Sequence, residues 1–445
     1  MSKARIAFVL AIVGLSGILY GIGSSGSAMS VSLPYLRETT AFTSAQLSLL
    51  VGACMLGAVV SGLFAGPLAD WIGRKRSFVV AAALFAAGSP ALALSNGTYS
   101  VMMGAMLVQG LGIGIFGIVS PLYLAEVLPP RMRGKGTGFF QLVIIVGIVL
   151  SGLFGLALSS WIGPPDSTAL SLAAKTRCWQ IVFGCVSLPA LLVLICSFFL
   201  GESPVWLGGK AKGDGQLRQS SPDARPQLPD SLFSRRYIVP FVLAFTILVC
   251  NQTTGINAVL AYSVTIFREA GLRGAFANGA DSIFKVAMLF ATVAACALVD
   301  RKGRVYLLKL GTAGIVASMA VAGVVMLGVR AGTFAASPAT GWTVAAALVV
   351  FISSFAVGPG VCVWLALTEL MPSRIRAVGM SVALVANQGV ATTLQATMLP
   401  LTDRIGYGWL FLFFALCTVG YWMTVSFFLP ETKGRTLEDI EKEWM

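Results

Sequence analysis

Side chains that form hydrogen bonds interrupt a long apolar stretch in the middle of this chain. The stretch runs from about residue 238 to 267 and contains NQTTGINAVLAY at 251–262. Amides both donate and accept hydrogen bonds, so Asn251, Gln252 and Asn257 suit a ligand that presents neutral hydroxyl groups. The alternative is that these amides only join neighbouring helices, with each contact worth about 1 kcal/mol or less.

The polar side chains of this segment do not share one helix face. At about 100° per residue, counted from Asn251, Gln252 falls near 100°, Asn257 near 240° and Tyr262 near 20°. A straight helix would therefore present some of them to lipid. We expect either that neighbouring helices satisfy them or that the helix bends near Gly255, where irregular backbone lines a wet cavity.

The composition identifies the elements that must position these groups. The chain is 57% hydrophobic and 11% charged, with a mean hydropathy of +0.85, which excludes a soluble globular protein. Apolar segments of about 18 to 25 residues, long enough to cross a bilayer as helices, recur along the chain. We predict twelve: about 6–28, 46–69, 77–95, 99–125, 136–158, 178–200, 238–267, 280–299, 305–329, 342–368, 377–400 and 408–429.

The distribution of charge predicts the orientation of these helices. If both termini are cytoplasmic, most of the 31 lysine and arginine residues lie on the inner side, as the positive-inside rule requires. The net charge of +13 then serves orientation and the anionic inner leaflet, and we expect no nucleic-acid partner. The short loops and Ala-rich composition favour a bacterial inner membrane.

Other kinds of chemistry find no support in the sequence. The eight cysteines lie in or beside apolar segments without metal-ligand spacing, and the chain contains no histidine. No nucleophile, base and orienting group converge, and no phosphate-binding glycine loop precedes a soluble helix. We expect no enzyme activity, no cofactor and no metal site.

The two halves of the chain carry similar motifs in the same order. A hydrophilic stretch at 201–237, which we predict to be a cytoplasmic linker, separates an N-terminal bundle of six helices at 1–200 from a C-terminal one at 238–429, followed by a cytoplasmic tail at 430–445. GPLADWIGRKR, AEVLPPRMRG and GESPVWL in the first half correspond to LVDRKGR, TELMPSRIRAVG and LPETKGRTLE in the second. Repetition of this kind indicates duplication.

These six stretches, in order and spacing over essentially the whole chain, resemble the signatures of the sugar porter family of the major facilitator superfamily. NQTTGINAVLAY is similar to the QQxxGIN signature of that family. The resemblance implies an all-α integral membrane protein with twelve transmembrane helices, in two six-helix halves with inverted 3+3 repeats. It also implies a substrate site between the halves near the membrane midplane.

The resemblance assigns substrate-binding residues one by one. Gln141 matches a fifth-helix glutamine, Trp364 a tenth-helix tryptophan that stacks on the sugar ring, and Asn387 an eleventh-helix amide. The Gly358-Pro359-Gly360 break before Trp364 could bend the tenth helix. Together the expected sugar-binding residues form an aromatic platform among amides: Gln141, Asn251, Gln252, Asn257, Tyr262, Trp364 and Asn387.

Three positions depart from the family pattern. Asn251 replaces a glutamine, Ala261 replaces a tyrosine, and Met288 stands where an eighth-helix asparagine usually touches the sugar. The pocket therefore has fewer polar side chains that could contact the sugar. A hexose such as glucose is the expected substrate, and a pentose, a polyol or a sugar acid remains an alternative.

The residues that couple transport to protons are absent from their family positions. Proton-driven members carry an aspartate in a first-helix GYD triplet and an arginine in the fourth helix; here Gly23 and Met106 stand at these places. The joint loss avoids an unpaired charge in a low-dielectric environment. We expect facilitated diffusion (uniport) by alternating access, with a proton-coupled symporter as the alternative and a non-transporting sugar sensor as a weaker one.

Only one acidic residue is expected inside the membrane. Asp281 and Lys285 lie four residues apart on the eighth helix, a spacing that lets them pair. In one interpretation Lys285 extends toward the headgroups to meet Asp281. In the other, the pair is an alternative charge site that faces the central cavity and acts on a carboxylated substrate or a proton.

Charged residues at the cytoplasmic helix ends complete the expected mechanism. By resemblance they form ion-pair networks that stabilise the outward-facing state and break when the inner side opens; exposed pairs of about 1 kcal/mol or less can bias such an equilibrium. We expect the protein to act as a monomer in the lipid bilayer. The predicted gate residues are Asp70, Arg74, Glu126, Arg133, Glu202, Asp300, Arg304, Glu369, Arg376 and Glu431.

Overall fold

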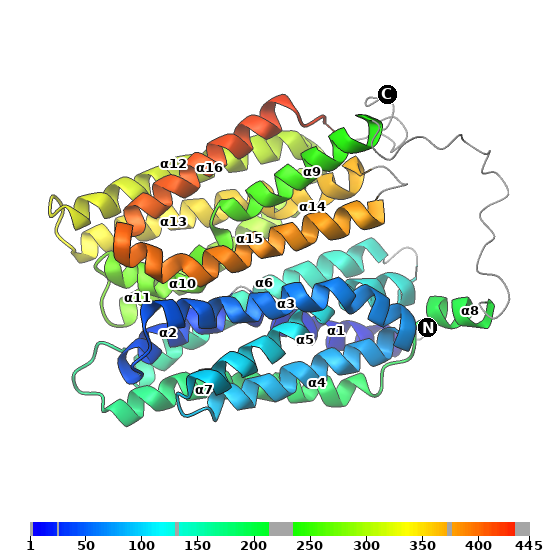
Figure 1. Cartoon of the computed structure of the whole chain (residues 1–445), viewed down its shortest axis with the longest axis horizontal. Coiled ribbons are helices and arrows are strands. Elements are labelled where there is room, and N and C mark those ends of the chain that lie inside the picture. The colour runs from blue at the N-terminus through cyan, green and yellow to red at the C-terminus, as the bar shows by residue number, and fades with distance from the viewer. Residues whose placement is uncertain (1–2, 25, 130–132, 213–234, 372–375, 432–445) are drawn as a thin grey trace.

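The computed structural model describes residues 3–24, 26–129, 133–212, 235–371 and 376–431, and all regular structure in these ranges is helical. Within these ranges, seven helices belong to the first half and eight to the second, with one short helix between them; Figure 1 shows their arrangement. The first half comprises α1 (Lys3–Ser24), α2 (Ser27–Thr39), α3 (Ser44–Ile72), α4 (Arg74–Ala93), α5 (Tyr99–Val127), α6 (Arg133–Trp161) and α7 (Leu172–Ser197). The others are α8 (Pro204–Lys212), α9 (Arg235–Thr253), α10 (Ile256–Glu269), α11 (Ala275–Lys302), α12 (Arg304–Arg330), α13 (Pro338–Val357), α14 (Pro359–Leu370), α15 (Arg376–Ile405) and α16 (Tyr407–Phe427).

Most of these helices are long enough to cross a membrane, alone or joined with the next helix. Eleven stretches of the described chain are long and apolar enough to cross a membrane. The 30-residue α15 is also long enough to span, although its central part carries several amides and threonines. The all-helical architecture with twelve spans is thus confirmed.

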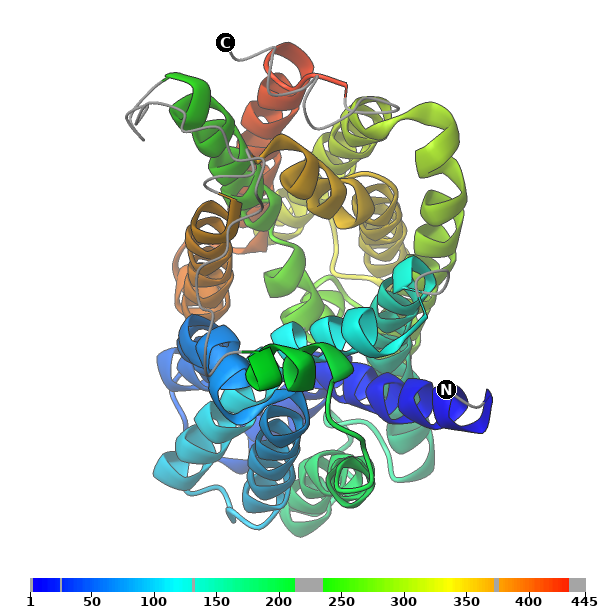
Figure 2. The same cartoon turned by 90° about the vertical axis from the view of Figure 1, so that its right-hand side faces the viewer.

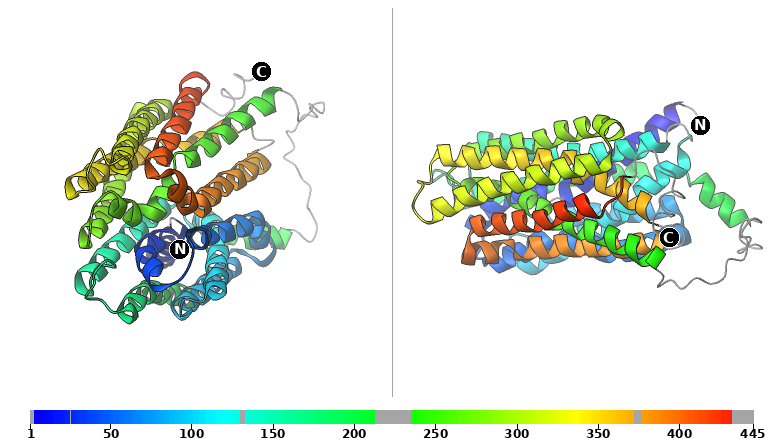
Figure 3. Two further views of the ribbon diagram at one scale, coloured as in Figure 1. Left: turned by 60° about the vertical axis from the view of Figure 1, so that its left-hand side comes forward. Right: turned by 90° about the horizontal axis from the view of Figure 1, so that it is seen from above.

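The two halves lie side by side with their helices roughly along one direction (Figures 1 and 3). We call the end that holds the N-terminus and α8 the termini side, which faces the viewer in Figure 2, and the opposite end the far side. The predicted linker at 201–237 is described only in part. Its first residues include α8, and residues 213–234 lie outside the described ranges. Residues 432–445 of the predicted tail lie outside them as well.

Three membrane helices are broken by glycine. Gly255 separates α9 from α10 with a φ of 82°, and a Cβ there would stand 2.5 Å from the Phe414 ring, so only glycine fits. This break and the one at Gly358 agree with the sequence-based expectation. The break at Gly26, with a φ of 65°, was not expected: the predicted span 6–28 is in fact two helices, α1 and α2.

Candidate solute-binding site

Three of the predicted binding residues meet at the break between α9 and α10. The Gln252 amide donates to Asn387 Oδ1 on α15 at 3.1 Å, and the Asn257 amide donates to Gln252 Oε1 at 2.8 Å. Asn387 in turn donates to the Leu248 carbonyl at 2.8 Å, which fixes its orientation. The Gly255 break brings Gln252 and Asn257 to the same place even though a straight helix would point them apart. We call Gln252, Asn257 and Asn387 the amide cluster.

Asn251 and Gln395 extend the polar environment around the cluster. The Gln395 amide donates to the Asn257 carbonyl at 3.2 Å. Asn251 is buried, and its Oδ1 has no hydrogen-bond partner among the described residues. A buried carbonyl without a donor costs about 1–3 kcal/mol, so a ligand hydroxyl that reached Asn251 Oδ1 would gain this free energy.

Tyr262 lies farther toward the far side than the amide cluster. Its hydroxyl donates to the Gln395 carbonyl at 2.7 Å and lies 3.1 Å from Ser48 Oγ on α3. The same Ser48 oxygen accepts from the Leu399 backbone N–H at 2.9 Å. Tyr262 therefore joins the two halves, and its predicted contact with substrate stays a prediction. Sequence reasoning did not identify Ser48, which no family signature marked.

Of the remaining predicted binding residues, Gln141 makes no hydrogen bond to the amide cluster in the described part of the chain. Gln141 on α6 is exposed. The side chain of Trp364 lies outside the described residues, although its helix α14 follows the expected break. Ala261 and Met288, where polar family residues are missing, are both buried.

Gly23 and Met106 line one small cavity in the first half, of about 20 Å³. The described residues around this cavity carry no charge, and its polar groups include the Gln109 amide and the Cys54 thiol. Space at Gly23 is filled by Ile113, because a Cβ would stand 2.3 Å from Ile113 Cδ1. The two positions that the sequence singled out are thus neighbours, and an acid at Gly23 would have to displace an apolar side chain.

Asp281 and Lys285 form an ion pair of 2.8 Å in which both side chains are fully buried. Both side chains are enclosed by protein, whereas one interpretation of the sequence extended Lys285 toward the headgroups. Ser263 donates to Asp281 at 2.5 Å and lies 2.9 Å from Ser30 on α2. Gly152 on α6 covers the pair so closely that a Cβ there would stand 2.8 Å from Lys285 Cδ. The charges are sealed where α11 packs on the first half.

On the termini side, several contacts of the gate residues join residues of the same half. Arg74 bridges Asp70 at 2.8 Å and Glu126 at 2.9 Å, and Glu126 also accepts from Ser203. Glu202 accepts from the Lys75 backbone N–H at 3.0 Å.

The second half repeats the carboxylate contact of Glu202. Glu431 accepts from the backbone N–H groups of Arg304 at 3.0 Å and Val305 at 3.1 Å. A carboxylate at the first turn of a helix complements the helix dipole, so Glu202 and Glu431 stabilise the starts of α4 and α12. Four predicted gate residues have side chains outside the described residues: Arg133, Asp300, Glu369 and Arg376.

Additional polar contacts join the halves at the far side. Arg268 on α10 lies 3.8 Å from Glu38 on α2 and 3.9 Å from Asp166 in the loop before α7. Asp166 also accepts from the Gly274 backbone N–H at 3.0 Å, and Lys175 pairs with Glu38 at 2.5 Å. Together with Tyr262 these contacts close the far side. No sequence signal identified them, because their partners come from helix ends and loops that lie far apart in the chain.

Comparisons with known proteins agree with this architecture. A family model described as "Sugar (and other) transporter" matches residues 7–231 and again 217–444. The galactose-proton symporter of Escherichia coli is 29% identical over 100% of this chain and 95% of its own length. The glucose transporter GlcP of Staphylococcus epidermidis is 29% identical over 99% of this chain and 98% of its own.

Among solved structures, the fold is similar to that of the xylose transporter XylE from Escherichia coli in its inward open conformation. The TM-score is 0.80 at 22% identity, and the alignment covers 98% of this chain and 99% of that one. This match confirms the twelve-helix arrangement in two halves that the sequence predicted.

Proposed function

Since this chain belongs to the sugar porter family of the major facilitator superfamily, we propose that it carries a monosaccharide, a hexose such as glucose, by alternating access and without an accompanying ion. That it is an integral membrane sugar transporter and not an enzyme follows from the family. The identity of the sugar and the uncoupled mechanism are the proposal.

The observation that carries the proposal is the amide cluster beside a broken helix. Gln252, Asn257 and Asn387 supply donors and acceptors without net charge, and Asn251 adds a buried acceptor that lacks a partner among the described residues. Such groups match the hydroxyls of a neutral sugar and offer an ionic ligand no counter-charge. Their position at the Gly255 break agrees with the rule that irregular backbone within a membrane lines a cavity.

The uncoupled mechanism is supported by the cavity that Gly23 and Met106 share. The described residues around it include no group that could take up a proton on the way through the first half. A proton symporter remains the second candidate because the galactose relative bears that name. Asp281 is the buried acid that could serve it.

Alternation between two states would follow from the contacts between the halves. Tyr262, Ser48 and Arg268 close the far side, and their separation would open a path to the amide cluster from that side. By the positive-inside rule we propose that the termini side is cytoplasmic. We also propose that the protein acts as a monomer, in the inner membrane of a bacterium.

Counterflow in proteoliposomes tests the proposal. Labelled hexoses, pentoses and polyols are offered with and without an imposed pH gradient, to the native protein and to Gln252→Ala. The matched control is Gln180→Ala, since that amide lies at the far side on α7 and bonds, within the described residues, only to Asn96. Exchange of glucose that is insensitive to the gradient and weakened only by Gln252→Ala supports the proposal, whereas uphill accumulation driven by protons contradicts uniport.

A further inference from the structure

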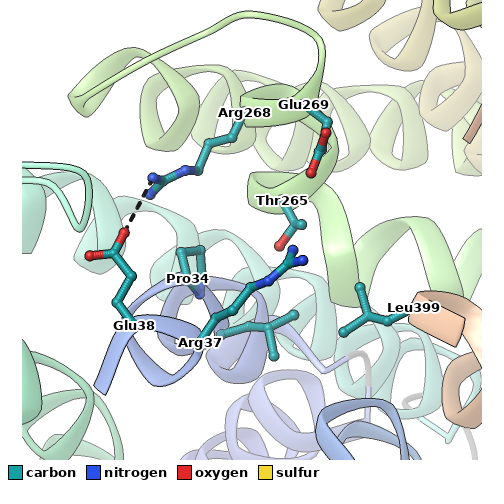
Figure 4. Close-up of a pocket in the computed structure, with 8 residues that line it drawn as sticks. Pro34, Arg37, Glu38, Thr265, Arg268, Glu269 and Leu399 are labelled. Carbon is teal, nitrogen blue, oxygen red and sulfur yellow. Dashed lines mark ion pairs between the residues drawn. The ribbon is translucent and has the colours of Figure 1, made fainter. Parts of the chain in front are cut away.

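A second cavity lies at the far side, between the two halves and separate from the amide cluster. Its volume is about 180 Å³, and its walls come from α2, α10 and α15 (Figure 4). The polar part consists of Arg37 and Glu38 from the first half and Thr265, Arg268 and Glu269 from the second. Leu33, Pro34 and Leu399 supply the apolar part. We call this cavity the far-side vestibule.

The contact that closes the far side separates the vestibule from the amide cluster. Thr265 follows Tyr262 by three residues on α10, and Leu399 follows Gln395 by four on α15. The vestibule therefore begins about one helical turn beyond the Tyr262 hydrogen bonds, and Thr265 lies about 12 Å from Asn257 along the helix. A molecule in the vestibule would wait outside the closed contact.

Several polar groups of the vestibule lack partners in the described chain. Thr265 is 8% exposed, so more than nine-tenths of it is buried, yet its hydroxyl makes no hydrogen bond there. Arg268 pairs through Nη2 with Glu38, while its buried Nη1 has no partner among the described residues. A buried polar atom without a partner costs about 1–3 kcal/mol, so a ligand that supplies the missing partners gains that free energy.

Arg37 and Glu269 provide the remaining donor and acceptor groups. Neither forms an ion pair within the described residues, and Figure 4 shows their side chains on the same part of the cavity as Thr265, away from the Arg268–Glu38 pair. A carboxylate can accept hydrogen bonds from two adjacent hydroxyls, and a guanidinium donates through a planar fork. The two groups therefore fit a molecule with neighbouring hydroxyls on a ring.

The balance of charge narrows the ligand class. Two arginines and two glutamates line the vestibule, so its walls have no net charge and favour neither an anion nor a cation. Pockets for drug-sized ligands measure about 300–1,000 Å³, and this cavity is smaller. The leucine and proline side chains offer an apolar surface for the C–H groups of a small ring.

We propose that the far-side vestibule is a second binding site for a neutral monosaccharide, occupied while the far side is closed. The choice of a sugar rests on the proposed function, because it assumes that the vestibule receives the molecule that the amide cluster then binds. Holding a molecule one turn from the closed contact raises its local concentration at the moment of opening.

Equilibrium binding of labelled D-glucose to the purified protein in nanodiscs tests the proposal. We expect two sites per chain. Glu269→Gln and Thr265→Val should weaken one of them, about tenfold or more for the charged group, and leave the other within about twofold. Gln252→Ala should weaken the other site alone. Asp403→Asn and Arg273→Gln, which alter exposed far-side charges outside the vestibule, should change neither.

The outcomes separate failure of the vestibule from failure of the transport proposal. A single site that only Gln252→Ala weakens would overturn the vestibule and leave the proposed function intact. No glucose bound at either site would remove the proposed function and the vestibule together. Because Glu269→Gln could disturb folding, glucose binding at the amide cluster serves as the check that this variant is folded. If Glu269→Gln loses both sites and Thr265→Val has no effect, the result also counts against the proposal.

Discussion

Removal of one charge from the Asp281–Lys285 pair should hold the transporter open at the far side. Both side chains are fully buried when the far side is closed, with Gly152 against Lys285 and Ser263 as a neutral partner of Asp281. In Lys285→Met the Asp281 carboxylate remains, and within the described residues only Ser263 donates a hydrogen bond to it. Breaking a buried pair by removing one partner costs about 3–5 kcal/mol, because the other charge stays buried.

That cost applies to the closed far side only if opening lets water reach the pair. Separation of α11 from α6 would uncover the face that Gly152 now seals, and the remaining charge would then be hydrated. The ratio of far-side-open to far-side-closed molecules should therefore rise about 100-fold or more in Lys285→Met and in Asp281→Asn. The double variant carries no charge there and should return toward the native ratio.

Spin labels at Thr98 and Thr333, in far-side loops of the two halves, measure this equilibrium in a background without reactive cysteines. Distances between the labels should lengthen in both single variants and shorten again in the double variant. Lys309→Met removes a lysine from α12 that makes no ion pair with the described residues, and it serves as the control. The reasoning fails if the single variants keep the native distances, or if the double variant is as open as they are.

Four further substitutions test other parts of the mechanism. Gln252→Ala removes two hydrogen bonds of the amide cluster and should raise the KM for glucose counterflow roughly tenfold; an unchanged KM would count against the site. Glu126→Ala takes from Arg74 its two-oxygen partner and should slow counterflow while glucose affinity measured from the far side stays the same, so a loss of affinity would contradict a gating role. Gly23→Asp alone should give no proton-driven accumulation and less folded protein, because Ile113 fills the space, and adding Met106→Arg should recover folded protein by pairing the charge; accumulation by the single variant would refute this. Gly255→Ala forces a Cβ against Phe414 at a positive φ and should lower stability by about 1–3 kcal/mol, seen as a reduced Tm, and an unaltered Tm would show that the break tolerates a side chain.

The sequence predicted those features that depend on residues close together in the chain. Gly255 stands between amides that a straight helix could not satisfy in lipid, so the break there was foreseeable, as was the one in Gly358-Pro359-Gly360. The break at Gly26 was missed because its serine neighbours are small and lie near the end of the predicted span 6–28, where they also fit a continuous helix. Small residues alone do not distinguish a bend from close packing.

Contacts between distant parts of the chain were beyond sequence reasoning. The pairing of Asp281 with Lys285 was foreseen from their spacing, but Gly152, which covers the pair, comes from a helix more than 100 residues away, so the full burial of Lys285 could not be inferred. The Arg268–Glu38 pair joins positions 230 residues apart. Neither residue belongs to a recognisable signature, and a single sequence does not record which charges meet.

The two kinds of polar contact in this transporter have different roles in alternation. Glu202 and Glu431 bind backbone N–H groups within their own halves at the same sequence separation of 127 residues, so a rigid rotation of the halves would leave both contacts intact. Tyr262 binds Ser48 across the halves and would lose this contact on opening.

The balance between the states must therefore be set by cross-half contacts. Neutral hydrogen bonds contribute about 0.5–1.5 kcal/mol each and exposed ion pairs about 1 kcal/mol or less, so the far-side contacts Tyr262–Ser48 and Arg268–Glu38 bias the equilibrium without freezing it. Burial of the Asp281–Lys285 pair acts differently from these contacts. The ion pair does not join the two halves, but the closed state loses stability when one of the two charges is removed. Because the contacts between the halves are weak, the halves can separate and close again. The closed state is stable only when Asp281 and Lys285 are both present or both replaced by neutral residues.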